Sequence, residues 1–150
     1  MDLAHLDLAT GYLALFALSF AAATLLPIGS EWLLATLLLQ GGDPLFLVVT
    51  ATAGNLLGAI STWLVGRYGG EFLIRRCLRI DRETQQRAEE RYSRYGLWSL
   101  LLSWVPIIGD PLCLIAGLFR VRLAIFIPLV GLGKLGRYLL LAWAVVAGRG

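Results

Sequence analysis

Residues 97–119 read LWSLLLSWVPIIGDPLCLIAGLF, and this stretch decides the architecture. The apolar run 97–108 meets Gly-Asp-Pro at 109–111, and only the short piece 112–119 follows before the next arginine. A helix of about nine to twelve residues is about 14–18 Å long, so it does not cross the roughly 30 Å of hydrocarbon in a bilayer. We therefore predict a re-entrant hairpin with residues 106–111 at its tip, where irregular backbone needs cover from protein or a wet cavity.

The composition around this stretch is that of a membrane protein. The 150 residues are 58% hydrophobic and 15% charged, with a mean hydropathy of +0.75. Soluble proteins average about 45–50% hydrophobic and about 25% charged residues. This excludes a disordered chain, a coiled coil and most soluble globular domains.

The charges are also gathered into a few places. Twenty-three uncharged residues separate Asp7 from Glu31, and 23 more separate Asp43 from Arg67. Such runs match the length of a membrane-spanning helix. Because 8 of the 13 basic residues lie between Arg67 and Arg94, the basic excess indicates membrane topology rather than nucleic-acid binding. We predict one all-α integral membrane domain over 1–150, with the loop 67–95 on the cytoplasmic side.

The N-terminal part repeats the pattern of short apolar pieces. The apolar run 11–26 ends at the turn residues 27–31, and a second run, 32–40, is again short. One interpretation is a second re-entrant hairpin over 11–40 with its tip at 27–31. The other is a full span ending near Ser30, followed by an interfacial stretch, and the sequence leaves both open.

Two longer apolar runs predict helices over 44–66 and 123–148. The first contains Gly54-Asn55-Leu56-Leu57-Gly58, a GxxxG face suited to close helix packing. We expect it to end in a tight turn at Gly66-Arg67-Tyr68-Gly69-Gly70. The connector 67–95 then carries acid-before-base pairs four residues apart, which favour an amphipathic surface helix; a plain solvated charged connector is the alternative. The three pairs are Glu71–Arg75, Glu83–Arg87 and Glu90–Arg94.

A shift of 79 residues brings special positions into register. Pro27-Ile28 falls on Pro106-Ile107, Glu31 on Asp110, and Gly54-Asn55 on Gly133-Lys134. Repeat one would cover about 11–66 and repeat two about 97–148. If each repeat is one hairpin plus one crossing helix, the two have opposite orientation, which is the inverted-repeat plan of secondary transporters.

Ionisable groups inside a membrane are costly and are functional candidates by default. Glu31, Asp110, Lys134 and Arg137 are these groups, with Asn55 as a neutral partner. Two acids on hairpin tips and two bases on one helix suggest ion pairs across a cavity. A proton- or ion-coupled site for a polar or anionic group is the functional interpretation, and paired charges that hold the hairpins in register are the structural one.

Other kinds of site are disfavoured. The single histidine, His5, lies near the terminus, so a His-dependent triad or an HExxH zinc site is absent from the sequence. Cys77 and Cys113 are isolated and are interpreted as apolar fillers. Ser30 is expected to be a turn or cap residue, and most of the Trp and Tyr residues are expected to be interface anchors. We expect no enzyme, metal or cofactor.

These motifs together resemble the DedA family, also called VTT or SNARE-associated membrane proteins. Short motifs carry the resemblance: Pro27-Ile28-Gly29-Ser30-Glu31, Gly54 to Gly58, Gly66-Arg67-Tyr68-Gly69, Tyr92-Ser93-Arg94-Tyr95-Gly96 and Ala116-Gly117. The segment around Pro106 and Gly109, with Gly133-Lys134 and Arg137-Tyr138, is similar to the short YqaA-like subgroup. The resemblance covers essentially the whole chain.

The resemblance implies a bacterial inner-membrane protein with two facing re-entrant hairpins. The family is associated with moving lipids or lipid carriers, for example undecaprenyl phosphate, between leaflets, often coupled to the proton-motive force. Glu31 matches the acidic residue of the family's first hairpin. The second hairpin departs from the pattern: Ser103 and Gly109-Asp110 flank its proline where larger members carry arginine, and Lys134 and Arg137 would supply that charge.

The sequence thus predicts a flippase for an anionic lipid or lipid carrier. Lys134 and Arg137 would receive the headgroup, and Glu31 and Asp110 would respond to protons. A non-transporting membrane homeostasis or assembly factor is the alternative. The partners expected are the bilayer and its lipids, without nucleic acid; substrate, coupling ion and oligomeric state stay open.

Overall fold

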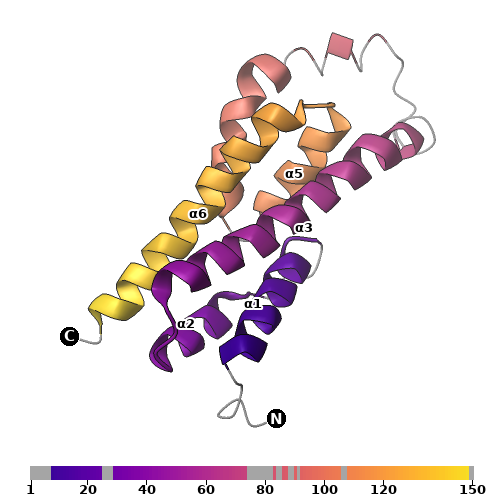
Figure 1. Cartoon of the computed structure of the whole chain (residues 1–150). Coiled ribbons are helices and arrows are strands. Elements are labelled where there is room, and N and C mark those ends of the chain that lie inside the picture. The colour runs from indigo at the N-terminus through magenta and orange to yellow at the C-terminus, as the bar shows by residue number, and fades with distance from the viewer. Residues whose placement is uncertain are drawn as a thin grey trace. The chain divides into compact units, whose positions relative to one another are not determined.

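The computed structural model describes residues 8–24, 29–73, 83, 86–87, 90, 92–105 and 108–148. Nearly all of these residues are helical, and no strand occurs among them (Figure 1). The prediction of an all-α protein is therefore confirmed for the described part of the chain. Pro27, Pro106 and Cys77 lie outside the described residues, as does most of the expected amphipathic helix.

Two of the described helices are long and apolar enough to cross a membrane: α3 (Pro44–Leu73) and α6 (Leu123–Ala147). Their most apolar windows are only 44% and 22% buried within the chain. A core helix of a soluble protein would be mostly buried, whereas these helices expose large apolar side chains such as Phe46 (66%) and Trp143 (72%). Lipid is the environment that such surfaces favour.

Helix α3 continues to Leu73, so the expected helix exit at Gly66-Arg67-Tyr68-Gly69-Gly70 is wrong. The glycines serve helix packing instead. A Cβ on Gly66 would meet the carbonyl oxygen of Leu114, and a Cβ on Gly70 would meet the Leu118 side chain. The close approach to α5 (Gly109–Leu118) thus explains glycines that sequence reasoning interprets as a turn.

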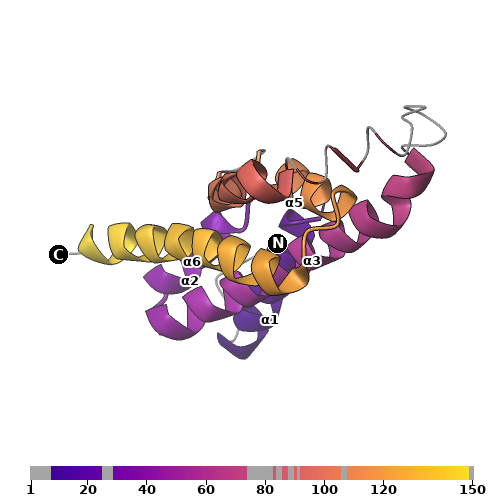
Figure 2. The ribbon, with the colours of Figure 1, turned by 90° about the horizontal axis from the view of Figure 1, so that it is seen from above.

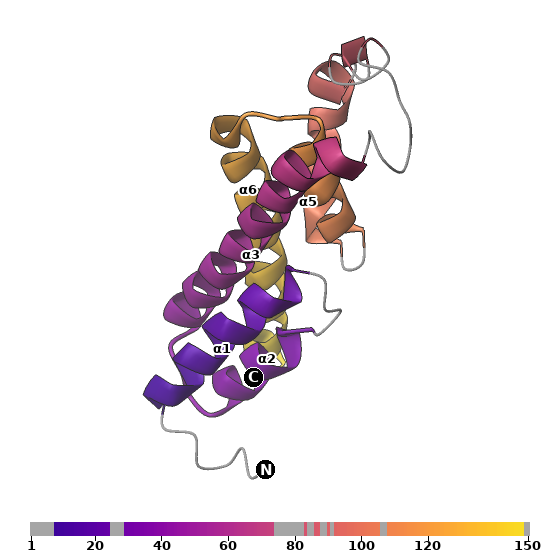
Figure 3. The ribbon, with the colours of Figure 1, turned by 90° about the vertical axis from the view of Figure 1, so that its right-hand side faces the viewer.

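The other helices of the described residues are short. They are α1 (Leu8–Ala22), α2 (Glu31–Leu39), a π-helical turn η3 (Tyr92–Gly96), a 3₁₀ helix η4 (Leu97–Trp104) and α5. Helix α1 contacts α2, and η4 contacts α5 (Figures 2 and 3). At 15 residues, even α1 is only about 22 Å long. In both pairs, each helix is too short to cross the hydrocarbon layer, as expected of a re-entrant hairpin.

The chain divides into two compact units. Unit 1 comprises Met1–Gly58 and Lys134–Gly150, and unit 2 comprises Ala59–Gly133. In unit 1, the predicted GxxxG face packs α3 on α1: a Cβ on Gly54 would meet the Phe16 carbonyl, and one on Gly58 would meet the Phe20 carbonyl. An apolar cluster fills the same unit, and its fully buried members include Leu34, Leu47 and Tyr138.

In unit 2, α3 and α5 approach each other through glycines on both helices. A Cβ on Gly117 would meet the carbonyl oxygen of Trp63, and a Cβ on Gly66 would meet that of Leu114. The Trp63 and Phe126 rings pack beside this contact, with centroids 6.1 Å apart. Because backbone meets backbone at both glycines, neither position leaves room for a side chain.

Helix boundaries recur at the predicted offset. Helix α2 ends at Leu39 and α5 at Leu118, 79 residues later. Helix α3 begins at Pro44 and α6 at Leu123, again 79 residues apart. The start of α5, at Gly109, is one residue short of the position equivalent to the start of α2.

The helix caps recur at the same offset. Gly41, with φ 91°, follows α2, and Arg120, with φ 54°, follows α5. Each cap has the paired hydrogen bonds of a Schellman motif. The Gly42 N–H donates to the Leu37 carbonyl (3.0 Å), and the Val121 N–H donates to the Ala116 carbonyl (2.9 Å). Two segments with little sequence identity thus end their short helices in one conformation, which supports an internal repeat.

Arg120 is the only described non-glycine residue with a positive φ, and this conformation costs an L-residue about 1 kcal/mol. Arg120→Gly is therefore expected to raise the free energy of unfolding by about 0.5–1 kcal/mol. Thermal denaturation in detergent micelles measures the change. Arg122→Gly, which removes the same charge from a nearby exposed position, is the control. Equal stability of the two variants would contradict the strain argument.

The connector 67–95 is described only in part. Residues 67–73 belong to α3, and Tyr92–Gly96 form η3. Of the three predicted charge pairs, Glu83–Arg87 forms an ion pair with an N–O distance of 2.5 Å between largely exposed side chains. The Tyr92 ring packs on Phe119, with centroids 4.9 Å apart, and burial raises the pKa of its hydroxyl above the ordinary value.

Candidate functional site

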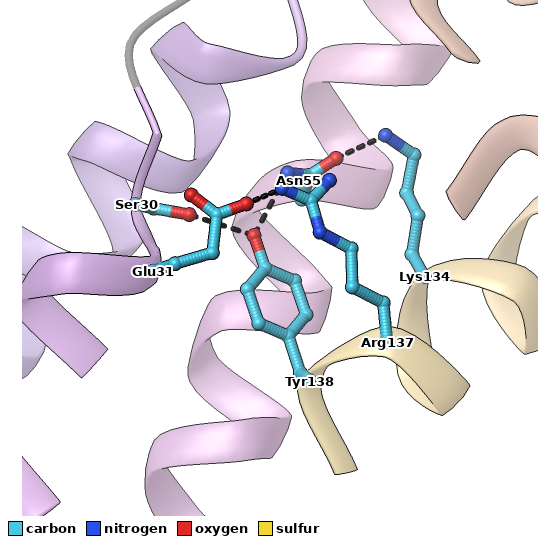
Figure 4. Close-up of polar contacts among 6 residues, drawn as sticks. All are labelled: Ser30, Glu31, Asn55, Lys134, Arg137 and Tyr138. Atoms are coloured by element: carbon cyan, nitrogen blue, oxygen red, sulfur yellow. Dashed lines mark hydrogen bonds and ion pairs between the residues drawn. The ribbon is translucent and has the colours of Figure 1, made fainter. Parts of the chain in front are cut away.

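Six polar side chains of unit 1 gather where the start of α2 meets the middle parts of α3 and α6 (Figure 4). Helix α2 contributes Glu31 and the preceding Ser30, and α3 contributes Asn55. Helix α6 contributes Lys134, Arg137 and Tyr138, whose spacing of three and four residues places them on one helix face. We call these six residues the polar cluster.

Glu31 and Arg137 form an ion pair, as predicted from the sequence. The exposed fraction is 28% for the Glu31 side chain and 20% for the Arg137 side chain. A Cβ on Gly29 would collide with the Glu31 carboxylate, so the glycine leaves room for this carboxylate. The Arg137 guanidinium also lies over the Tyr138 ring, 5.9 Å from its centroid, a favourable cation–π arrangement.

The other four members of the polar cluster form a chain of hydrogen bonds. The Lys134 ammonium donates to Asn55 Oδ1, and Asn55 Nδ2 donates to the Tyr138 hydroxyl at 2.9 Å. The Tyr138 hydroxyl and Ser30 Oγ share a hydrogen bond of 2.7 Å. All four side chains are buried, with exposed fractions between 0% and 4%. Burial of this many polar groups is tolerated because they bond to one another.

Two members of the polar cluster were missed by sequence reasoning. Ser30 stands at the N-cap of α2 but makes no capping hydrogen bond with its side chain; it bonds to Tyr138 instead. Tyr138 is fully buried, so it does not follow the interface-anchor role expected for most of the Trp and Tyr residues. Its position four residues after Lys134 is the signal that could have identified it, because the two residues share a helix face.

The polar cluster carries two basic side chains and one acidic side chain. A buried ammonium is expensive and is held here by an amide oxygen. An excess of positive charge in a partly closed polar site favours an anion. The arginine fork suits a phosphate or carboxylate group in particular. Among the described residues, no group of three or more His, Cys, Asp and Glu residues is placed to hold a metal ion.

Comparison with known proteins identifies the family. The model of the VTT domain matches residues 26–147. The chain belongs to the VTT domain family. This confirms the resemblance that the motifs indicate. No solved structure matches the chain.

Curated bacterial proteins are similar to this VTT domain protein. Inner membrane protein YqaA of Escherichia coli K12 is 44% identical over 136 residues, which cover 90% of this chain and 91% of that protein. An uncharacterized protein of Haemophilus influenzae is 36% identical over 135 residues, which cover 85% of this chain and 82% of that protein. The similarity to YqaA agrees with the short subgroup suggested by the sequence.

The VTT match includes the whole polar cluster and also Asp110. Asp110 lies in unit 2, half-buried in the first turn of α5, and its expected approach to Lys134 or Arg137 stays a prediction. Lys134 contacts Asn55, and the pair is separated by the repeat offset of 79 residues. The structure thus brings together four of the five predicted site residues within unit 1.

Most of the other predicted motif residues that the structure describes have structural contacts. Gly54, Gly58, Gly66 and Gly117 allow close helix packing, and Gly109 is buried against the Ser103 backbone. A Cβ on Gly96 would meet the Tyr92 ring. The Arg67 guanidinium lies over the Trp63 ring, 5.3 Å from its centroid, and Arg94 is exposed. Cys113 is a buried cysteine in its thiol form.

Proposed function

We propose that this VTT domain protein is a multi-pass protein of the bacterial inner membrane that moves an anionic lipid or lipid carrier between leaflets. The observation that carries the proposal is the polar cluster, in which Arg137 pairs with the single carboxylate, Glu31, while Lys134 donates to Asn55. The two long apolar helices support the membrane location, and the printed name of the Escherichia coli relative agrees with it. Undecaprenyl phosphate is an example of such a carrier.

Transport would proceed by exchange of partners at Arg137. An arriving anionic headgroup competes with Glu31 for the guanidinium, which can hold a phosphate through two parallel hydrogen bonds. The displaced carboxylate, left without its cation in a poorly hydrated site, takes up a proton. Proton uptake would thereby accompany headgroup binding, without an enzymatic step or a cofactor. Asp110 is proposed to play the equivalent part in the second hairpin.

The proposed architecture is an inverted repeat of one re-entrant hairpin plus one membrane-spanning helix. The short lengths of α2, η4 and α5 support the hairpins, and the recurring helix boundaries support the repeat. The contact between Asn55 and Lys134 is a further support. Asn55 and Lys134 occupy equivalent positions of the two repeats, and two equivalent residues can contact each other when both lie close to the two-fold axis.

The proposed topology places both ends of the second hairpin on the cytoplasmic side. In a background without Cys77 and Cys113, cysteines at positions 83 and 122 are expected to react with a membrane-impermeant reagent from the cytoplasm. A cysteine at Gln40 is expected to react from the opposite side. Labelling of positions 83 and 122 from opposite sides would mean that residues 97–119 span the membrane, and would exclude the hairpin.

The experiment that tests transport is a flipping assay in reconstituted vesicles. A fluorescent anionic lipid is followed by chemical quenching in the outer leaflet, with and without a pH gradient, beside protein-free vesicles. Translocation by the wild-type protein that responds to the gradient, and that is lost in Lys134→Met, would support the proposal. A wild-type protein that moves lipid no faster than protein-free vesicles would instead favour a non-transporting homeostasis or assembly factor.

A further inference from the structure

The Tyr138 hydroxyl is the point at which the polar cluster is joined together. It accepts a hydrogen bond from Asn55 of α3 and shares another with Ser30 at the start of α2. Its ring is fully buried in the apolar cluster of unit 1, beside residues such as Leu34 and Leu47. The ring is therefore held by packing while the hydroxyl reaches the polar groups (Figure 4).

The direction of these hydrogen bonds follows from the chemistry of the groups. The ammonium of Lys134 has only donors, so Asn55 must present its oxygen to Lys134. The amide nitrogen of Asn55 then points to Tyr138 and can only donate. The hydroxyl oxygen of Tyr138 must accept this bond, while its second bond, to Ser30 Oγ, limits rotation of the hydroxyl. One arrangement of the amide thus satisfies both neighbours.

The opposite orientation of the Asn55 amide would be costly. It would place the NH₂ group against the ammonium of Lys134, where donors would face each other in a buried site. The hydroxyl of Tyr138 resists this rotation because it holds the NH₂ group at 2.9 Å. Without the hydroxyl, Asn55 would lose a buried partner, and Lys134 would lose the fixed oxygen that orients its ammonium.

We propose that Tyr138 is a positioning residue for anion capture, which acts through Asn55 to hold the Lys134 ammonium in place for a phosphate-bearing headgroup. This inference rests on the proposed function in taking an anionic lipid as the ligand. It assigns to a buried tyrosine on α6 a role that neither the charge pattern nor the ion pair includes. Tyr138 does not touch the headgroup in this arrangement; its effect passes through Asn55 to the lysine.

The test measures binding rather than transport, so that it is independent of the flipping assay. Wild-type protein in phosphatidylcholine nanodiscs is titrated with a fluorescent phosphatidic acid analogue. Tyr138→Phe, which keeps the ring and removes the hydroxyl, is expected to raise the Kd about tenfold, the effect of losing one well-formed polar contact. Tyr12→Phe is the matched control, because Tyr12 packs against the same apolar cluster, and its Kd should stay within about twofold.

A double mutant separates positioning from general structural support. If Tyr138 acts through Lys134, then Tyr138→Phe should change the Kd little in a Lys134→Met background, because the group that it positions is gone. A merely structural tyrosine would weaken binding by the same factor in both backgrounds, and that result would overturn the inference. Melting temperatures of all variants, measured in the same nanodiscs, show whether the Phe variant is folded.

Two further outcomes distinguish the positioning role of Tyr138 from the proposed transport. Wild-type protein that binds the probe but does not move it in vesicles would refute the proposed transport and leave the positioning role intact. Wild-type protein that does not bind the probe would overturn both. An unfolded Tyr138→Phe protein would be replaced by Asn55→Leu, which breaks the same link on α3 and should show the same dependence on Lys134.

Discussion

Arg137→Ala is expected to abolish lipid translocation and to lower the free energy of unfolding by about 2–3 kcal/mol. The substitution leaves the Glu31 carboxylate without its cation in a site where it is 28% exposed. Removing one partner of a buried ion pair costs about 3–5 kcal/mol. Because the Glu31–Arg137 pair is partly exposed, we expect the loss in free energy of unfolding to be at or below the lower end of that range. Chemical denaturation in mixed micelles measures the stability, and the flipping assay measures transport.

The double mutant Glu31→Gln, Arg137→Ala distinguishes the two interpretations of the pair. It removes both charges, so most of the lost stability should return. If the pair is only structural, transport should return as well. If Arg137 receives the headgroup and Glu31 exchanges a proton, transport should remain absent. Full transport in the double mutant would therefore contradict the proposed mechanism.

Glu31→Gln alone tests the coupling. It keeps a polar side chain next to Arg137 but cannot take up a proton. We expect translocation that no longer responds to the pH gradient, in a protein that remains folded. The matched control is the double mutant Glu83→Gln, Arg87→Gln, which removes a largely exposed ion pair. That variant should change stability by no more than about 0.5 kcal/mol and leave the response to the gradient intact.

The long helices were predictable because their apolar runs are bounded by charge and by turn residues. Asp43 shows why the start of α3 was clear: its carboxylate accepts hydrogen bonds from the N–H groups of Leu45 (2.9 Å) and Phe46 (3.1 Å), which is the local chemistry of an N-cap. The end of α3 was not predictable in this way. Gly66 and Gly70 are helical because they meet α5, and that contact lies almost fifty residues further along the chain.

The charged members of the polar cluster were predictable because charge is rare in an apolar chain. Tyr138 was not, and the reason is physical. In a soluble protein, an apolar stripe marks the buried face of a helix. In a membrane helix, lipid and protein interior are both apolar, so the pattern does not distinguish the faces. Fully buried Tyr138 and the 72% exposed Trp143 lie on one helix, and both would pass for interface aromatics.

The Ser30 interaction illustrates a second limit. A serine before a short helix is well explained as a cap, and the sequence contains nothing against that explanation. The structure shows that Ser30 bonds a tyrosine 108 residues away. Local propensity predicts where a helix begins; it does not predict which distant group competes for a side chain at that position. Functional sites are where such competition is most frequent.

Gly66→Ala is expected to be strongly damaging, although it adds only one methyl group to unit 2. Its Cβ would meet the carbonyl oxygen of Leu114 and lie 3.0 Å from the Leu118 nitrogen. Both are backbone atoms of α5, so relief requires the helices to separate rather than a side chain to rotate. Overpacking costs about 1–3 kcal/mol, and we expect the upper end of this range, together with poor accumulation in the membrane. Gly117→Ala, whose Cβ would meet the Trp63 carbonyl, should behave in the same way.

Gly69→Ala is the matched control on the same helix. A Cβ there would have only one neighbour, a methyl group of Val65 at 4.0 Å, and alanine is the better helix former by about 1 kcal/mol. We therefore expect Gly69→Ala to leave the melting temperature unchanged or to raise it, while Gly66→Ala lowers it. Melting temperatures in micelles and protein levels in isolated membranes measure both effects. If the two variants were equally stable, the glycines would be turn residues after all, and the close contact of α3 with α5 would be wrong.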